Sequence, residues 1–251
     1  MTQPATTLPA EEMSAAFPAA FERFGRTLRV GHPGVGTGAV PCPVLFCPGA
    51  LAAACGTYAA TLAPSGADRR ATISLWSQYY LLALVPAVVA AALAAEHDLP
   101  VDASGMGAVL ASSGLPDCLC LPHGGRRTAV SCPVSRLTPL LRGHLQPLAA
   151  ALAGAGLPQR VFWSNAAQVL VWSLCTVSAP GAACGAVSHA ATRPDWADGS
   201  PNPFAPALAG DGRSRRVCCL RYRLPGITLC PGCPRPAGAS NPKAGRGPRA
   251  S

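Results

Sequence analysis

Residues 215–234 read Arg-Arg-Val-Cys-Cys-Leu-Arg-Tyr-Arg-Leu-Pro-Gly-Ile-Thr-Leu-Cys-Pro-Gly-Cys-Pro. This stretch decides the least ordinary part of the fold, because it concentrates four cysteines: Cys218, Cys219, Cys230 and Cys233. Their spacing is CC-x10-C-x2-C. Four thiolates complete the protein ligands of a zinc ion or of an iron–sulfur cluster. The stretch therefore predicts a metal centre.

The ten residues between the cysteine pairs indicate how the sulfurs converge. Leu220, Tyr222 and Leu224 alternate with arginines, which is the period of a strand. Pro225-Gly226 is a turn dipeptide, although it favours a type II turn over the primed turns of tight hairpins. We predict a hairpin that brings all four sulfurs near one end.

The spacing alone leaves the metal open between zinc and an iron–sulfur cluster. Zinc sites usually use two separated CxxC pairs. Neighbouring side chains on a strand point to opposite faces, so Cys218 and Cys219 need a kinked backbone to share one ion. Two irons take two thiolates each, so a [2Fe–2S] cluster accepts a less regular arrangement.

The rest of the chain predicts an α+β fold with a predominantly helical body. We expect a body with a central hairpin at 1–194, a linker at 195–212, a small cysteine-rich hairpin or loop segment at 213–235 and a disordered basic tail at 236–251. The expected elements are helices at Pro9–Arg26, Ile73–Glu96 (bent or interrupted at Pro86), Ser135–Ala155, Pro158–Thr176 and Ala179–Ala191, a loop at Gly31–Pro48 and a hairpin at Met106–Leu121.

Charge is segregated along the chain. The formal net charge is +9, yet residues 1–211 hold eleven basic and eleven acidic side chains and so sum to zero. Residues 212–251 hold nine basic side chains and no acidic one. The basic run lacks interleaved aromatic residues and a nucleic-acid-binding motif, so we expect no nucleic-acid partner.

The N-terminus and the remaining cysteines bear on the compartment. No positive segment followed by an apolar one opens the chain, so we expect no secretory signal, a cytoplasmic location and free thiols. The uncharged stretch 73–95 favours a buried core helix over a membrane span, with peripheral membrane association as the alternative. We expect eight cysteines to be small buried hydrophobes: Cys42, Cys47, Cys55, Cys118, Cys120, Cys132, Cys175 and Cys184.

The cysteine segment resembles that of the FhuF-type ferric-siderophore reductases, in which the same spacing binds a [2Fe–2S] cluster. The resemblance runs from Arg216 to Tyr222 and from Cys230 to Pro234, and more loosely through Leu75–Ala87 and Phe162–Ala166. It implies a cytoplasmic reductase that passes one electron to Fe(III) held by a siderophore. Hard oxygen donors hold Fe(III) better than Fe(II), so reduction loosens the chelate. No dinucleotide or flavin fingerprint is visible, so an external donor such as a ferredoxin or a flavin reductase is implied.

Two groups of residues around this chemistry are candidates for supporting roles. Arginines that flank the ligands favour the more negative, reduced cluster and attract an acidic donor or an anionic chelate, unless they only solvate the segment: Arg215, Arg216, Arg221 and Arg223. Candidates for a siderophore pocket, with core packing as the alternative, are Trp76, Tyr79, Tyr80, Trp163 and Asn165. His97 and His189 are expected as surface or capping residues, and His123 lies in a glycine-rich loop.

Two other functions remain open on this evidence. One is a structural zinc module on a helical scaffold. The other is an iron–sulfur sensor or electron carrier without a siderophore site.

Overall fold

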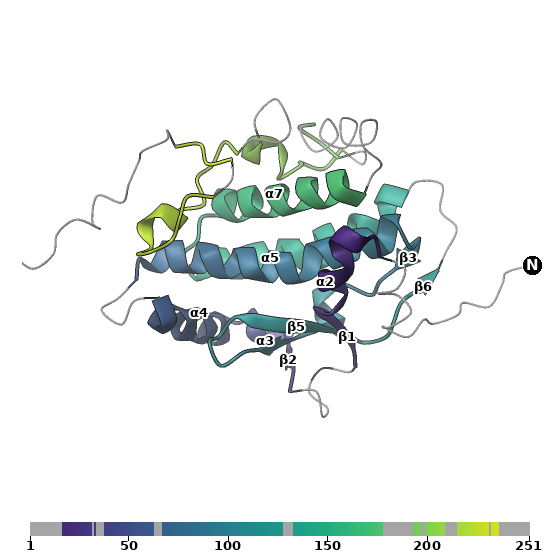
Figure 1. Ribbon diagram of the computed structural model, residues 1–251, viewed down its shortest axis with the longest axis horizontal. Helices are drawn as coiled ribbons and strands as arrows, with labels where there is room; N and C mark the ends of the chain where they lie inside the picture. The colour runs from purple at the N-terminus through teal and green to yellow at the C-terminus, as the bar shows by residue number, and fades with distance from the viewer. Residues whose placement is uncertain are drawn as a thin grey trace, which may run out of the picture.

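The computed structural model describes residues 17–31, 33, 38–62, 67–127, 133–177, 193–196, 199–208, 215–230 and 232–235. Helix α5 (Arg69–Leu93) runs through the middle of the molecule. Figure 1 shows helix α7 (Gln159–Val177) along one side of α5 and, on the other side, helix α4 (Pro48–Leu62) with the sheet. The described residues therefore form an α+β fold dominated by helices.

Helix α5 is the central element because most of its side chains are apolar. The Asp68 side chain caps its N-terminus by accepting a 2.9 Å hydrogen bond from the backbone N–H of Ala71. The helix continues through Pro86, so the expected interruption does not occur. Proline removes only one backbone hydrogen bond, and the carbonyl that loses its partner belongs to Leu82, which is an exposed residue.

By length and composition, α5 alone among the described helices is able to cross a membrane. However, 89% of its most apolar window is buried inside the fold. That burial is typical of the core helix of a soluble protein, as the sequence predicted.

The main sheet has the strand order β1-β5-β4-β2. Strands β4 and β5 pair antiparallel, which confirms the hairpin expected at Met106–Leu121, and β1 joins β5 in parallel. The bounds are β1 Leu28–Val30, β2 Val40–Pro41, β4 Gly107–Leu110 and β5 Pro116–Leu121, and a second sheet pairs β3 (His97–Asp98) with β6 (Arg126–Arg127). Strand β5 lies against α5, so the sheet closes one side of the core.

The first sixty residues differ from the expectation. The stretch Gly31–Pro48, expected as a loop, contains β2 and helix α3 (Cys42–Leu45), and α4 begins at its end. The expected helix Pro9–Arg26 is described only from Phe17. It consists of a 3₁₀ turn (Ala19–Phe21) and the short helix α2 (Glu22–Gly25).

The stretch Ser135–Ala155 is helical as expected, but not uniformly. It forms a 3₁₀ turn (Pro133–Leu137), a π-helix (Pro139–Leu145) and helix α6 (Gln146–Gly154). Helix α7 confirms the expected Pro158–Thr176 helix. The expected helix Ala179–Ala191 and the tail 236–251 lie outside the described residues.

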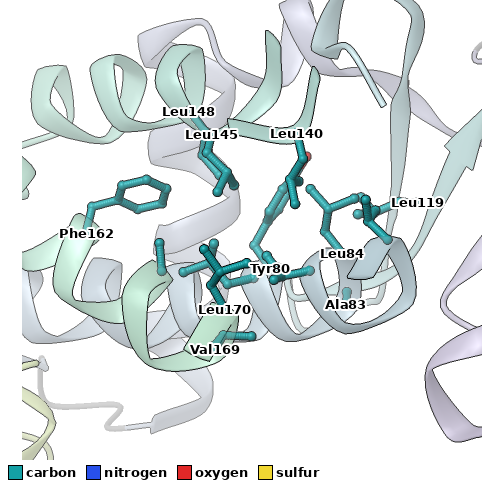
Figure 2. Close-up of a cluster of buried hydrophobic side chains, with 14 of the residues drawn as sticks. Tyr80, Ala83, Leu84, Leu119, Leu140, Leu145, Leu148, Phe162, Val169 and Leu170 are labelled. Carbon is teal, nitrogen blue, oxygen red and sulfur yellow. The ribbon is translucent and has the colours of Figure 1, made fainter. Parts of the chain in front are cut away.

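The core lies where α5, α6, α7 and the sheet meet. Figure 2 shows Tyr80 and Leu84 of α5 among Leu140, Leu145 and Phe162, all of which are fully buried. This core fixes the relative positions of α5 and α7, whose N-terminal halves carry the site described below.

Residues 199–208 belong to the stretch expected as a linker, yet they pack on the body. Phe204 and Leu208 are buried, and the Phe204 ring meets Trp163 edge-on with centroids 5.3 Å apart. An isolated bridge then pairs Leu208 with Arg215. Through Phe204 and Leu208, this stretch therefore contacts both Trp163 of α7 and Arg215, the first described residue of the cysteine segment.

The cysteines and histidines outside the cysteine segment divide by environment. Four cysteines are buried free thiols, as predicted: Cys42, Cys55, Cys118 and Cys120. Cys47 is exposed, and Cys175 is disulfide-bonded, so neither is a buried free thiol. His97, expected as a surface or capping residue, is buried, and its Nε2 lies 2.9 Å from the Gly124 carbonyl. His123 Nδ1 accepts a 3.2 Å hydrogen bond from the Gly125 N–H. Cys132, Cys184 and His189 lie outside the described residues.

Candidate metal centre

The cysteine segment (the described residues from Arg215 to Arg235) contains no β-ladder, so the predicted hairpin is wrong. Leu220 adopts the left-handed conformation with φ 64°, and a 3₁₀ turn follows at Arg221–Arg223. A strand cannot run through a left-handed residue. The Pro225-Gly226 turn is present, with Gly226 at φ 68° as a type II turn requires at that position.

The left-handed residue directly follows the two adjacent cysteines. It reverses the backbone directly after Cys219, and the Leu220 N–H lies 3.4 Å from the Cys218 sulfur. At the other pair, Gly232 has φ 68° and the Cys233 N–H donates a 3.2 Å hydrogen bond to the Cys230 carbonyl. Two tight turns thus shape the two ends of the motif.

Two of the four cysteines come together without a hairpin. The Sγ atoms of Cys219 and Cys230 lie 3.3 Å apart, and both residues are buried. Cys218 and Cys233 are half-buried. Burial raises the pKa of Cys218, whereas the hydrogen bond from the Leu220 N–H lowers it.

The Cys219–Cys230 pair is electrostatically asymmetric. The contact with the Cys230 sulfur lowers the pKa of Cys219, against the effect of burial, and the charges of Arg215 and Arg221 lower it further. The pKa of Cys230 is raised by the same contact and by burial. One thiol of the pair is therefore ready to ionise, as ligation of a metal requires.

The arginines differ sharply in their settings. Arg215 is only 8% exposed, whereas Arg216 is exposed. Arg223 forms an ion pair with Asp68 at 3.2 Å, and the Arg235 guanidinium lies 3.9 Å from the centroid of the Tyr222 ring. Three Nε atoms of the segment are buried without a hydrogen-bond partner: those of Arg215, Arg221 and Arg235.

These features fit a thiolate-bound cluster. Four sulfur donors suit zinc or iron–sulfur sites rather than hard cations. Within the described part of the chain, no three Cys, His, Asp or Glu side chains gather as ligands of a single ion would. The close contact joins two sulfurs, those of Cys219 and Cys230. Unpaired N–H groups beside the thiols are the donors that hydrogen-bond cluster sulfur and shift its potential.

Polar side chains of the body hold the segment in place. Ser74 Oγ donates a 2.7 Å hydrogen bond to the Cys219 carbonyl, and Ser164 Oγ donates one of 2.9 Å to the Val217 carbonyl. Asn165 Oδ1 accepts a 2.7 Å hydrogen bond from Arg215. Ser74 was not expected from the sequence to contact the cysteine segment. The signal that could have revealed it is a pair of serines inside an otherwise apolar helix.

Most of the predicted pocket residues are not at a surface. Trp76 and Tyr80 are fully buried, and the Trp76 indole N–H donates to the Gly114 carbonyl at 2.8 Å. Trp163 packs in the core, and Asn165 belongs to the hydrogen-bond network above. The burial of these four residues agrees with the alternative interpretation, which is core packing. Tyr79 is 42% exposed, with its ring edge-on to Tyr58 at 5.9 Å.

Comparison with known proteins identifies the family of this chain. Residues 215–235 match the FhuF 2Fe-2S C-terminal domain. A protein of Escherichia coli (strain K12) described as a ferric siderophore reductase is 28% identical over 173 residues, which are 66% of this chain and 66% of that protein. The aligned part thus spans just under two thirds of that relative's length. Residues 74–215, more than half of the chain, match the family described as ferric iron reductase FhuF-like transporter. The chain therefore belongs to this FhuF family and carries its [2Fe–2S] C-terminal domain.

Proposed function

We propose that this protein reduces siderophore-bound Fe(III) to Fe(II), one electron at a time, through a [2Fe–2S] cluster held by four cysteines: Cys218, Cys219, Cys230 and Cys233. The observation that carries the proposal is the 3.3 Å approach of the Cys219 and Cys230 sulfurs in the segment that matches the 2Fe-2S domain. The name of the Escherichia coli relative supports the choice of substrate.

The proposed reaction requires only that the chain bind the cluster and the chelate and provide positive charge around the thiolates. When bound, the cluster supplies one electron, and Fe(III) in the chelate takes it up to become Fe(II), which hard oxygen donors hold more weakly. The iron then leaves an intact siderophore, so no nucleophile or general base is needed. The serine contacts fix the backbone of the segment, and the arginines supply positive charge around the thiolates.

We place the approach of the chelate over the exposed ring of Tyr79. This ring lies beside Tyr58, whose pKa is raised chiefly by burial and lowered by the charge of Arg221. Helix α5, which carries Tyr79, packs against the 3₁₀ turn Arg221–Arg223 and binds the Cys219 carbonyl through Ser74, so an aromatic surface and a cationic turn lie on the helix that holds the cysteine segment. We expect Tyr79→Ala to raise KM for the ferric chelate several-fold while leaving the cluster spectrum unchanged. An unchanged KM would remove Tyr79 from the binding surface.

The electron donor and the location are part of the same proposal. We infer an external one-electron donor, a ferredoxin or a flavin reductase, and a cytoplasmic site of action with peripheral contact to the membrane as the variant. Positive charge on the exposed side chain of Arg216 suits docking of an acidic donor. Such docking would weaken steeply as the salt concentration rises.

The decisive experiment is anaerobic purification followed by iron, sulfide and zinc analysis and electron-paramagnetic-resonance spectroscopy of the dithionite-reduced protein. We expect two irons and two sulfides per chain, a one-electron signal, and stoichiometric formation of Fe(II) in a ferrous trap when the reduced protein meets a ferric chelate. Colourless protein with stoichiometric zinc would establish the structural zinc module instead. A reducible cluster that reduces no ferric chelate would establish the sensor or carrier.

A further inference from the structure

Arg215 is a buried cation with an unusual set of partners. Its side chain donates one 2.7 Å hydrogen bond, to the neutral amide oxygen of Asn165, while its Nε is buried and unpaired. No carboxylate among the described residues forms an ion pair with it. Burying a charge without an opposite charge is costly. The Asn165 amide that binds Arg215 also binds Ser74, whose hydroxyl donates to the Cys219 carbonyl, so one hydrogen-bond network joins the cation to the cysteine pair.

The partner amide has only one possible orientation. Ser74 uses its hydroxyl proton on the Cys219 carbonyl, and Ser77 uses its own on the Ser74 carbonyl at 2.7 Å. Both hydroxyl oxygens can therefore only accept from Asn165, whose Nδ2 lies 3.0 Å from Ser74 Oγ and 3.1 Å from Ser77 Oγ. The NH₂ group of Asn165 must face the serines, and its oxygen must face Arg215.

This orientation links three separate parts of the chain. The two serines belong to α5, Asn165 belongs to α7, and Arg215 opens the cysteine segment. The same Ser74 that fixes the amide also holds the carbonyl of Cys219. Rigid helices that pack on each other thus set the distance between a cation and a metal ligand.

We propose that Asn165 is a positioning residue that holds the Arg215 guanidinium beside the Cys219–Cys230 pair, and that this buried charge raises the reduction potential of the cluster. The cluster gains one negative charge on reduction, so a fixed nearby cation stabilises the reduced form. The inference depends on the [2Fe–2S] domain but not on the ferric chelate.

The neighbour of Arg215 supplies a matched control. Arg216 carries the same charge one residue further on, but it is exposed, so water and salt screen it. We expect Arg215→Gln to lower the equilibrium constant for cluster reduction about tenfold or more, which is about 59 mV for a one-electron couple. Arg216→Gln should change it less than threefold. Equal shifts in the two variants would overturn the role of burial.

The role of Asn165 requires a double-mutant cycle. Asn165→Leu keeps a similar volume but removes the oxygen that orients Arg215, so the potential should fall in the Arg215 background. In the Arg215→Gln background the same change should produce no further fall, because there is no cation left to position. An unchanged potential, or an equal fall in both backgrounds, would overturn the proposal.

If Asn165→Leu does not fold, a milder variant tests the same proposal. Ser77→Ala removes one acceptor of the Asn165 amide and touches neither Arg215 nor a cysteine. It should shift the potential in the same direction by a smaller amount, and only when Arg215 is present. All potentials are measured by redox titration without chelate, on protein with verified iron and sulfide content. A failure of siderophore reduction is therefore distinguishable from a failure of this inference.

Discussion

In helices α5 and α7, most side chains are apolar and buried, and the two helices lie against each other along their length. The cysteine segment has one 3₁₀ turn, two left-handed glycines and a left-handed leucine, and it is held by hydrogen bonds to Ser74, Ser164 and Asn165. Burial of apolar surface stabilises the first region without help from a cofactor. The second is held by polar contacts, and we propose that its thiols bind the cluster, so the two regions should respond differently to the same kind of damage.

Loss of a single ligand should separate the two regions most clearly. We expect Cys230→Ala to abolish the visible absorption and the iron content while the far-UV circular dichroism of the helices remains. Hydrogen exchange should accelerate within residues 215–235 and stay slow in α5. Cys47→Ala removes an exposed cysteine outside the segment and should retain full iron. Helices that melt together with the cluster would show that the body is not independent of it.

A cavity in the core should damage the helical body and leave the cysteine segment intact. Leu84 is fully buried in the cluster of Figure 2, and its truncation removes packing that no other contact replaces. We expect Leu84→Ala to lower the free energy of unfolding by about 3 kcal/mol, measured by urea denaturation. The reduction potential of the folded fraction should not change. A potential that shifts with this variant would mean that the core and the cluster environment are coupled.

A buried histidine makes the stability of the body depend on pH. His144 Nδ1 donates to the Val101 carbonyl at 3.0 Å, so its Nε2 accepts from the Tyr80 hydroxyl at 2.8 Å. Burial lowers the pKa of His144 from 6.5 to about 4, against small opposing effects of Val101 and Asp102. The unfolded chain therefore binds this proton more readily, and stability is lost as the pH falls from about 6.5 to about 4.

The size of that loss follows from the difference between the two pKa values. It amounts to about 3 kcal/mol between pH 7 and pH 4. His144→Gln should be less stable at pH 7 but should lack this part of the pH dependence, in urea titrations at several pH values. Parallel slopes for the two proteins would show that the imidazole is already protonated in the fold.

How far the sequence predicts each region also differs. The presence of α5, the ends of α7 and the hairpin at β4 and β5 follow from local patterns of polarity and spacing, whereas α5 begins four residues before and ends three residues before the expected bounds Ile73 and Glu96. Helix α4 was not predicted, because its alanines and glycines give little contrast between one face and another. In the cysteine segment, the alternation of leucines and arginines resembles a strand, yet it cannot reveal that Leu220 turns left-handed. The site residues that were misassigned, above all Asn165, owe their roles to partners that are distant in sequence.

Asp68 contacts both regions, and its variants should have the smallest effects on stability. Its carboxylate caps α5 through the Ala71 N–H and pairs with Arg223 of the cysteine segment at 3.2 Å. Asp68→Asn keeps an oxygen for the cap but loses the charge, and a partly exposed ion pair contributes less than about 1 kcal/mol. Asp68→Ala also loses the cap, which costs about 1 kcal/mol more. We therefore expect thermal unfolding to rank the native chain above Asp68→Asn and Asp68→Ala lowest, with Arg223→Gln matching Asp68→Asn. If Arg223→Gln instead destabilised the protein as much as Asp68→Ala, the ion pair rather than the cap would be what joins the cysteine segment to the end of α5.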